Sequence, residues 1–312
     1  MGKKIISIVC SCFNEEENID EFYRQVKEVM APFENKYSYE QIFIDNASTD
    51  SSVRKIKALI EKDKRIRLIV NARNFGQVRS PYYGLLQANG DAAISMATDL
   101  QDPPGMLKNF IEKWEEGFKI VIGLKISSQE SKILFLMRKI FYNLIARMSE
   151  TEHIRNFSGF GLYDKQFLDI LRGLDDPYPY LRGLIPEFGF SRIGISYTQP
   201  KRQRGKTKNN LYTLYDMAML GFVNHSKVPL RLASLIGFAV AIFNILVALA
   251  YFIYKLIFWN NFQVGIAPLV IGIFFFAGVQ LFFLGIIGEY IGAIFTQVKK
   301  RPLVIEKERV NF

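Results

Sequence analysis

The chain has 312 residues, 49% of them hydrophobic and 22% charged, which gives room for one soluble domain of ordinary size and additional membrane segments. Two cysteines in a C-x-C arrangement exclude a disulfide-stabilised scaffold and suit no zinc site. The net charge of +10 is compatible with nucleic acid, a membrane surface or anionic ligands. Because seven lysines and arginines crowd residues 201–231, beside a long apolar run, we expect anionic lipid headgroups and no nucleic acid as the partner of this charge.

Short β-rich runs alternate with helical patterns through the N-terminal half, which predicts an open, largely parallel α/β sheet. Strands are expected at residues 5–12, 41–44, 66–70, 92–96 and 120–123, and helices at 16–29, 51–62, 79–88 and 104–116. Ligands of such sheets bind at the carboxyl ends of the strands. Polar clusters follow four of the predicted strands, at residues 14–16, 45–50, 73–76 and 99–104. The sequence therefore predicts that these clusters converge on one cleft.

The middle of the chain has a helical pattern from about residue 127 to Glu150 and a glycine-rich piece at residues 158–161. From Leu211 onward, apolar residues recur at helical spacing between basic residues. This pattern predicts an interfacial amphipathic helix over residues 209–229. An ordinary helix of the soluble domain remains an open alternative, because amphipathicity alone does not separate the two.

Two long apolar runs, Leu232–Tyr254 and Val264–Gly288, predict a transmembrane hairpin with helices within residues 230–258 and 264–296. The first run has 23 residues. As a helix it would extend roughly 35 Å, enough to cross a hydrocarbon core of about 30 Å. A spanning segment must satisfy its own backbone hydrogen bonds, so both runs are interpreted as helices.

The positions of the basic residues predict the orientation of this hairpin. Lysines and arginines lie before the first span and at residues 299–301 after the second, whereas the connecting loop has only Lys255. By the positive-inside tendency, the soluble domain (residues 1–208) and the C-terminal tail (residues 297–312) are both expected to be cytoplasmic.

The polar clusters resemble none of the commonest nucleotide-binding motifs. Neither G-x-G-x-x-G nor G-x-x-x-x-G-K-[ST] occurs in the sequence, so a dinucleotide oxidoreductase or a P-loop NTPase is not expected. Asp45 follows the second strand, where it can accept hydrogen bonds from a base or a ribose. Residues 99–102 supply hard oxygen ligands of the kind that hold Mg²⁺ or Mn²⁺. A solvent-exposed capping role for these acids remains equally open at this point.

Four segments, in order, carry a resemblance to a known family. They read VCSCFNEEENI at residues 9–19, IDNASTD at 44–50, RNFG at 73–76 and DLQDPP at 99–104. They resemble family 2 glycosyltransferases, and more narrowly the polyprenyl-phosphate (undecaprenyl or dolichyl phosphate) glycosyltransferases. RQRGKTK at residues 202–208 is similar to the R-x-x-G-x-S-K motif of that family. The sequence from Gly288 to Pro302 is similar to the family's closing membrane segment. The resemblance therefore covers nearly the whole chain.

This resemblance implies a GT-A catalytic domain with a Rossmann-like, mostly parallel sheet. It implies a nucleotide-sugar donor, for which UDP-glucose is the first expectation, a divalent metal (Mg²⁺ or Mn²⁺) and a polyprenyl phosphate acceptor, with inversion at the anomeric carbon. It also implies a multi-pass protein of the bacterial inner (plasma) membrane that modifies cell-envelope glycans.

The resemblance also implies roles for particular residues. Glu15 and Asp45 would contact the nucleoside, and Arg73 would help to hold the nucleotide. Asp99 and Gln101 would coordinate the metal on the diphosphate.

Further residues are expected near phosphates of the donor or acceptor. The resemblance places Arg202, Thr207 and Lys208 there. Thr207 would contact the nucleotide. Arg202 and Lys208 would be catalytic residues together with Asp99. Arg182 is a further phosphate candidate, with a surface arginine as the open alternative.

The sequence departs from the family pattern at two places. The family often has D-x-D-L-Q, but Ala97 stands at the first acid. Related enzymes also have a G-D-F-R-L segment, where this chain has Gly159 for the aspartate and Gly161 for the arginine. A phosphate acceptor, whose second pKa is about 6, is already mostly anionic at pH 7 and requires no general base. An essential acid such as Asp164 would contradict this hypothesis.

Two other functions remain as alternatives. A processive polysaccharide synthase would share the nucleotide-sugar domain, but its Q-x-x-R-W motif is missing from the sequence. A non-catalytic membrane scaffold is favoured only by the two departures. A homo-oligomer is compatible with Gly288-x-x-x-Gly292, which permits close helix packing.

Overall fold

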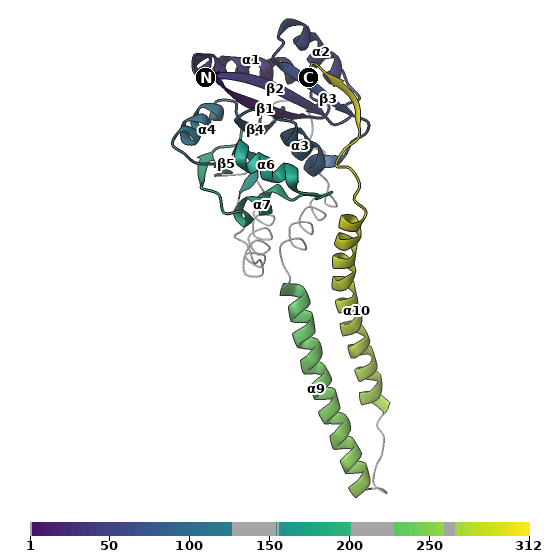
Figure 1. Cartoon of the computed structure of the whole chain (residues 1–312). Helices are drawn as coiled ribbons and strands as arrows, with labels where there is room; N and C mark the ends of the chain where they lie inside the picture. Colours follow the sequence, from purple (N-terminus) through teal and green to yellow (C-terminus); the bar gives the residue numbers. More distant parts are fainter. Residues whose placement is uncertain (1, 127–153, 155, 201–227, 259–265) are drawn as a thin grey trace.

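The structure, a computed structural model, describes residues 2–126, 154, 156–200, 228–258 and 266–312. An α/β domain is followed by two long helices that leave it on one side, and the chain then returns to the domain at its C-terminus (Figure 1).

A mixed sheet forms the centre of the α/β domain. Its strands in the described residues are β1 (Lys4–Cys12), β2 (Tyr37–Asp45), β3 (Ile66–Asn71), β4 (Ala92–Ala97), β5 (Ile120–Lys125), β6 (Phe157–Asp164), β7 (Arg192–Tyr197) and β8 (Glu306–Val310). They are ordered β7-β5-β6-β4-β1-β2-β3-β8. Strands β1 to β5 and β7 run in one direction, whereas β6 and β8 are antiparallel to their neighbours.

Helices cover both faces of this sheet and make a three-layer structure. One face carries α1 (Ile19–Met30), α2 (Ser52–Lys62) and α4 (Met106–Glu115), and the other carries α3 (Gly76–Leu86), α6 (Lys165–Gly173) and α7 (Leu181–Glu187). A short 3₁₀ helix (Ala31–Phe33) follows α1. Each helix buries one apolar stripe, as expected for amphipathic helices that pack on a sheet.

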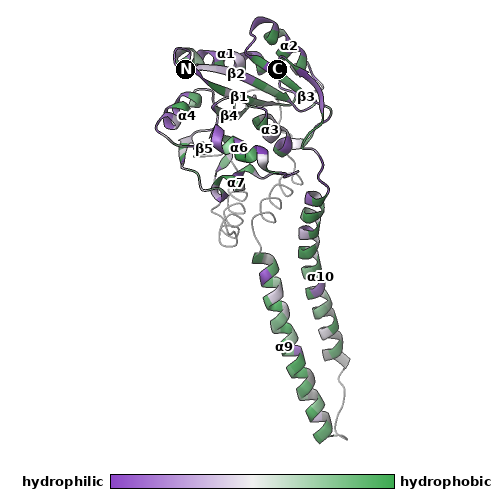
Figure 2. Ribbon diagram, in the orientation of Figure 1, coloured by the Kyte–Doolittle hydropathy of each residue, from purple (hydrophilic) through white to green (hydrophobic). Residues whose placement is uncertain are grey.

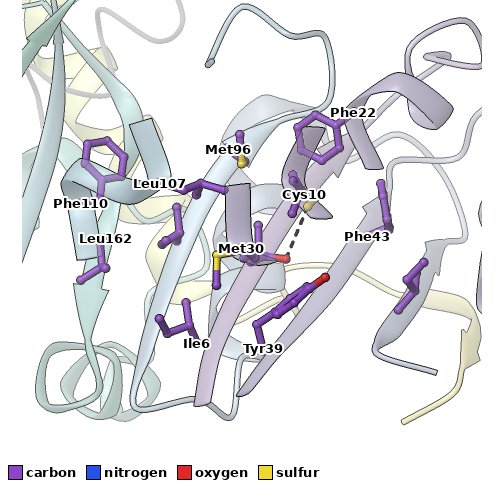
Figure 3. Packing of buried hydrophobic residues seen from close by; sticks show 14 of the residues in the cluster. Ile6, Cys10, Phe22, Met30, Tyr39, Phe43, Met96, Leu107, Phe110 and Leu162 are labelled. Carbon is purple, nitrogen blue, oxygen red and sulfur yellow. Dashed lines mark hydrogen bonds between the residues drawn. The ribbon is translucent and has the colours of Figure 1, made fainter. Parts of the chain in front are cut away.

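The alternation of side chains along β1 determines which layer each one joins. Ile6, Ile8 and Cys10 lie in the cluster with Phe22 of α1, part of which is drawn in Figure 3. Val9 points to the opposite face and joins the second cluster. Because β1 is buried on both faces, its sequence is nearly continuously apolar, as is typical of a central parallel strand.

The five strands and four helices predicted in the N-terminal half are all present, with ends shifted by a few residues. The predicted helical stretch at residues 127–150 and residues 209–227 of the predicted interfacial helix lie outside the described residues, whereas residues 228 and 229 belong to α9. Strands β6, β7 and β8 had no counterpart among the predicted elements.

The two apolar runs form α9 (Val228–Ile257) and α10 (Ile266–Val298). Within the described residues, Leu230–Tyr254 and Phe275–Val298 are long and apolar enough to cross a membrane, judged by length and composition. Neither is buried in the protein, and Figure 2 shows them apolar along most of their length. The two helices contact each other.

The C-terminal range that was predicted to be a tail contains β8, which pairs antiparallel with β3 at the edge of the sheet. Lys57 of α2 makes an ion pair with Glu308 (2.6 Å), and Tyr83 of α3 donates to Glu306 (2.8 Å). Asn311 donates to the carbonyl oxygen of Ile66 (2.7 Å). The residues after α10 therefore include a strand that is anchored to the sheet.

Candidate active site

A cavity of about 370 Å³ lies at the carboxyl ends of β1, β4 and β5. Ser11 of β1, Ala97 of β4 and Lys125 of β5 contribute to its wall. The remaining wall comes from α3, the turn after β4, the beginning of β6, the segment that enters α7 and Gln199 after β7. This is the position at which open parallel sheets bind ligands.

The turn between β4 and α4 presents Asp99 and Gln101 to the cavity. Thr98 anchors the beginning of the turn, because its backbone N and its Oγ1 donate to the carbonyl oxygen of Ser11 (3.1 and 3.0 Å). Leu100 adopts a φ of +60°, a left-handed conformation that an L-residue seldom takes. The backbone N of Gln101 donates to Asp99 Oδ1 (3.1 Å), which orients the carboxylate within the turn.

Two acids and two cations share this cavity: Asp99, Asp102, Lys125 and Arg182. Burial raises the pKa of Asp102 to about 6, with Lys125 opposing the shift and Asp99 adding to it. Burial lowers the pKa of Lys125, the nearby acids oppose this, and Arg182 adds to it. The four charges therefore interact, and the cations can neutralise phosphate oxygens that reach the cavity.

A divalent metal fits this donor set as an ion held partly by its substrate. Asp99 and Gln101 provide hard oxygens. No group of three or more His, Cys, Asp or Glu side chains in the described part of the chain could hold a metal by itself. Mg²⁺ usually keeps several waters and binds through one or two carboxylates together with substrate phosphates. The residues present are sufficient for that mode of binding.

Hydrogen bonds lock the loops after β1 and β2 together. The backbone N of Asn14 donates to Ser48 Oγ (2.8 Å), and that of Glu15 donates to Ser52 Oγ (2.9 Å). Ser48 donates from its N and its Oγ to the Asp45 carboxylate. Burial raises the pKa of Asp45, and the bonds from Ser48 oppose the shift. Glu15 and Asp45 thus lie on one interlocked pair of loops, and neither lines the cavity.

Asn46 joins the next loop to these two. Its Oδ1 accepts from the backbone N of Phe75 (2.8 Å) and from Asn71 Nδ2 (3.2 Å), and its Nδ2 donates to Asn74 Oδ1 (2.9 Å). Arg73 is exposed, with its guanidinium 4.1 Å from the centroid of the Phe75 ring, and does not line the cavity. The polar clusters after β1, β2 and β3 therefore contact one another, but Glu15, Asp45 and Arg73 do not line the cavity that contains Asp99, so the convergence of all four clusters on one cleft stays a prediction.

Gly159 and Gly161 stand where the family has an aspartate and an arginine, and the structure favours glycine at each position for a different reason. A Cβ on Gly161 would lie 2.5 Å from the carbonyl oxygen of Val121, so the close approach of β6 to β5 leaves no room for an arginine there. Gly159 has a φ of +100°, and a Cβ added to it would contact nothing within 4 Å. Space is therefore present at Gly159, but its backbone conformation favours glycine.

Asp164, considered above as a candidate base, lies at the wrong end of the sheet. It pairs with Ala92, the first residue of β4, whereas the cavity lies at the last residues of that strand. Its carboxylate accepts from Trp114 Nε1 (2.8 Å) and from the backbone N of Gln166 (3.0 Å). These contacts make it a structural residue at the beginning of α6.

The segment between α6 and α7 joins the end of α10 to the cavity. Lys300 makes an ion pair with Asp175 (2.9 Å), and Gln297 Nε2 donates to Asp176 Oδ1 (2.9 Å). A few residues further along, Pro179–Arg182 form part of the cavity wall. The cavity therefore lies beside the segment that contacts the C-terminal end of α10.

The structure brings together only some of the predicted site residues. Asp99, Gln101 and Arg182 share the cavity, and Glu15, Asp45 and Arg73 lie on loops outside its lining. Arg202, Thr207 and Lys208 lie outside the described residues. Their roles therefore stay predictions.

Lys125 and Tyr197 were missed by the sequence reasoning. Lys125 comes two residues after the predicted fifth strand, at its carboxyl end, which was a usable signal. Tyr197 had no such signal, because β7 was not predicted and the hydroxyl contacts Asp102 across 95 positions of sequence.

The family model described as glycosyl transferase family 2 matches residues 7–170, a range that includes most of β1, all of β2 to β6 and the Asp99 turn. The mixed sheet and this match define a glycosyltransferase domain of the GT-A type. The chain belongs to glycosyltransferase family 2.

Relatives match almost the whole chain. The SfII prophage-derived bactoprenol glucosyl transferase of Shigella flexneri is 32% identical over 304 residues, which is 97% of each chain. Uncharacterized glycosyltransferases from Synechocystis sp. (sll0501) and Bacillus subtilis (YkcC) are 31% and 33% identical. They cover 96% of this chain, and 94% and 92% of their own lengths. The similarity thus extends beyond the α/β domain into the long helices.

Solved structures with similar folds are more distant. Mannosyltransferase PcManGT from Pyrobaculum calidifontis, in complex with GDP-Man and Mn²⁺, has a TM-score of 0.44 and 16% identity, with 96% of this chain and 88% of that chain covered. Residues 1–349 of S. aureus TarS give a TM-score of 0.42 and 13% identity, with 71% and 66% covered. At these scores the likeness says nothing about substrate or metal.

Proposed function

We propose that this glycosyltransferase moves a sugar from a nucleotide sugar, UDP-glucose in the first instance, to a polyprenyl phosphate at the cytoplasmic face of a bacterial inner membrane. The relatives from Shigella flexneri and Shigella phage SfII, which are named as bactoprenol glucosyl transferases, support both the lipid and the sugar. One observation carries the proposal. The cavity that contains Asp99, Lys125 and Arg182 is lined by the same segment, between α6 and α7, that contacts the end of α10.

The proposed organisation follows the hydropathy of the chain. Residues 1–208 form the catalytic domain, 209–229 an interfacial segment, and 230–258 and 264–296 the two transmembrane helices. The positive charge on both flanks favours a cytoplasmic catalytic domain. Residues 306–310 pair with β3 of the same domain, which supports a catalytic domain and a C-terminal segment on one side of the membrane. This arrangement holds the active site near the depth at which a lipid phosphate leaves the bilayer.

The donor is proposed to bind across the converging loops. Glu15, Asp45 and Arg73 hold its nucleotide, with Thr207 further along the chain, and Asp99 and Gln101 hold a Mg²⁺ or Mn²⁺ ion on its diphosphate. The ion, when bound, stabilises the negative charge of the leaving diphosphate. The interlocked loops at Glu15 and Asp45 support this assignment, because a rigid site loses little entropy when its ligand binds.

The acceptor phosphate is proposed to lie against Lys125 and Arg182, with Arg202 and Lys208 contributing from the basic segment. One phosphate oxygen attacks C1 of the sugar from the face opposite the nucleotide, the bond from C1 to the diphosphate breaks, and the nucleoside diphosphate leaves. This displacement inverts the anomeric carbon. The attacking oxygen is already anionic at pH 7, so alignment and charge stabilisation are the tasks left to the protein.

Transfer of radioactive sugar into a lipid phase tests this function. The full-length protein in detergent is incubated with undecaprenyl phosphate, labelled UDP-glucose or other nucleotide sugars, and Mg²⁺ or Mn²⁺. We expect labelled lipid with the parent protein and a loss of about a hundredfold or more in the Asp99→Ala variant. Asp169→Ala, which removes an exposed carboxylate that pairs with Arg172 on α6, serves as the matched control and should retain activity.

Two results would contradict the proposal. A protein that labels no lipid with any donor, and whose Asp99→Ala variant binds nucleotide like the parent, would be a scaffold and not an enzyme. Label in a long polysaccharide instead of the lipid phase would indicate a processive synthase.

A further inference from the structure

The carboxylate of Asp102 is fixed at both oxygens. Oδ1 accepts a hydrogen bond from the hydroxyl of Tyr197 (3.0 Å), and Oδ2 accepts from the backbone N of Ala97 (3.3 Å). The Asp102 residue is 8% exposed. A buried carboxylate held at both oxygens is restricted in its orientation, and it is poorly placed to swing toward a cation as a substitute for the acid that Ala97 replaces.

Tyr197 is itself held by packing. It is buried at the end of β7, its ring meets Phe160 edge-on with 5.6 Å between centroids, and it pairs in register with Lys125. A Cβ on Gly123 would lie 3.1 Å from the Tyr197 ring, so that glycine leaves the room the ring occupies. The hydroxyl is therefore presented to Asp102 from a rigid position.

These contacts, together with those of Thr98, fix both ends of the turn at residues 98–102, which contains the proposed metal ligands. Thr98 binds the turn to β1 through the carbonyl oxygen of Ser11, and Asp102 binds it to β7 through Tyr197. Between the anchors, Leu100 holds a left-handed conformation that an L-residue seldom adopts. Such a conformation persists where the surrounding contacts determine it.

We propose that Asp102 and Tyr197 are positioning residues, and that Asp102 is not a third metal ligand: together they fix the turn so that Asp99 and Gln101 alone hold the cation. This inference rests on the proposed function, because it takes a donor diphosphate and a cation to bind at Asp99 and Gln101. It explains how the site works with Ala97 in place of an acid. The anchored turn presents its two remaining ligands without rearrangement, so less conformational entropy is lost on binding.

The test measures metal binding directly, with activity as a second readout. Mn²⁺ is titrated by calorimetry into the full-length protein in detergent with saturating UDP, and in parallel with GDP. Tyr197→Phe removes only the hydroxyl and should weaken Mn²⁺ binding about tenfold, the scale of one lost hydrogen bond to a charged group. Saturating Mn²⁺ should restore kcat to within about twofold of the parent, a split that a merely structural defect would not give.

Asp102→Asn separates positioning from ligation. The amide keeps the shape of the side chain, accepts from the N of Ala97 and donates to the Tyr197 oxygen, but it has no charge. Positioning therefore predicts Mn²⁺ affinity within about threefold of the parent for Asp102→Asn and a loss of about tenfold for Asp102→Ala. Ligation predicts that Asp102→Asn is as damaging as Asp99→Asn.

Tyr37→Phe is the matched control, because it also removes a buried tyrosine's bond to a carboxylate, that of Glu115 (2.8 Å), on α4 and away from the cavity. It should bind Mn²⁺ like the parent. Parent-like Mn²⁺ binding by Tyr197→Phe, or an Asp102→Asn defect equal to that of Asp99→Asn, would overturn the inference and leave the proposed function intact. A parent protein that binds Mn²⁺ with neither nucleotide would overturn the metal role in the proposed function as well.

Discussion

At the residue scale, Asp164 is an acid that stabilises the fold and does not line the cavity. Burial raises its pKa, but hydrogen bonds from Trp114 and Gln166 and the contact with Lys119 outweigh this, so its pKa is lowered. The stabilisation from the ionised form is therefore present above the unfolded-state pKa of about 4 and is lost as the pH falls below it. We expect Asp164→Asn to lower the free energy of unfolding by about 1 kcal/mol at pH 7 and to leave kcat within about twofold of the parent.

Thermal unfolding at pH 7 and pH 4, together with turnover, checks this expectation. The stability difference between Asp164→Asn and the parent should be smaller at pH 4 than at pH 7. Asp169→Asn, at an exposed ion pair of the same helix, should change stability little at either pH. A large loss of kcat at unchanged stability would instead make Asp164 an essential base.

Individual residues were predictable where local sequence carried the signal. Asp99 and Gln101 belong to a contiguous motif after a predicted strand, and the structure places both in the cavity. Asn46 and Tyr197 act through hydrogen bonds to segments distant in sequence. Such contacts depend on the order of strands in the sheet, which no local pattern contains.

At the element scale, β8 is the least expected feature of the fold. It closes the edge of the sheet beyond β3, and the carbonyl oxygen of Ile305 accepts from the backbone N of Ala72 beside Arg73. Deletion of residues 306–312 should lower the free energy of unfolding by about 2 kcal/mol or more, because it removes the strand pairing and several polar contacts. The Tm should fall by roughly 5 °C, and nucleotide affinity should weaken.

Glu308→Gln provides the control for this deletion. It removes one partly exposed ion pair with Lys57 and keeps the backbone pairing, so its effect should stay below about 1 kcal/mol. A deletion variant with the Tm of the parent would mean that β8 does not stabilise the domain.

Strands were predictable from the sequence where they are buried and apolar. Strands β1 to β5 are buried and apolar, and the sequence predicted them all. The sequence of β8, EKERV, resembles a charged tail because it is an edge strand with little apolar surface to bury. Its pairing with β3 is a tertiary contact that outweighs its weak intrinsic preference for a strand.

At the scale of the whole molecule, the two helices are proposed to bring the catalytic domain to its lipid. Replacing residues 228–298 with a flexible soluble linker, while retaining β8, should leave UDP binding within about threefold of the parent. Formation of lipid-linked sugar should fall about a hundredfold, because the acceptor loses its high effective concentration at the site. Fluorescence titration with UDP and product counting in vesicles measure the two effects separately.

An equal loss of UDP binding and of lipid-linked sugar formation would show that the helices stabilise the fold and do not act by bringing the acceptor to the site. The contacts favour an effect on the acceptor alone. Gln297 at the end of α10 and Lys300 just after it contact Asp176 and Asp175, which lie outside the loops proposed to bind the donor.

The central claim is that the acceptor is a lipid phosphate, and one comparison of acceptors tests it most directly. The purified full-length protein is given labelled UDP-glucose and Mn²⁺ with either undecaprenyl phosphate or undecaprenol, which differ only in the phosphate. We expect labelled lipid with undecaprenyl phosphate alone, at a rate that falls below about pH 6 as the phosphate is protonated. Because the pKa of Asp102 is also raised to about 6, the same fall in rate is expected in Asp102→Asn as in the parent. Equal labelling of undecaprenol, or a rate that depends on an ionising protein carboxylate instead of the phosphate, would contradict the account.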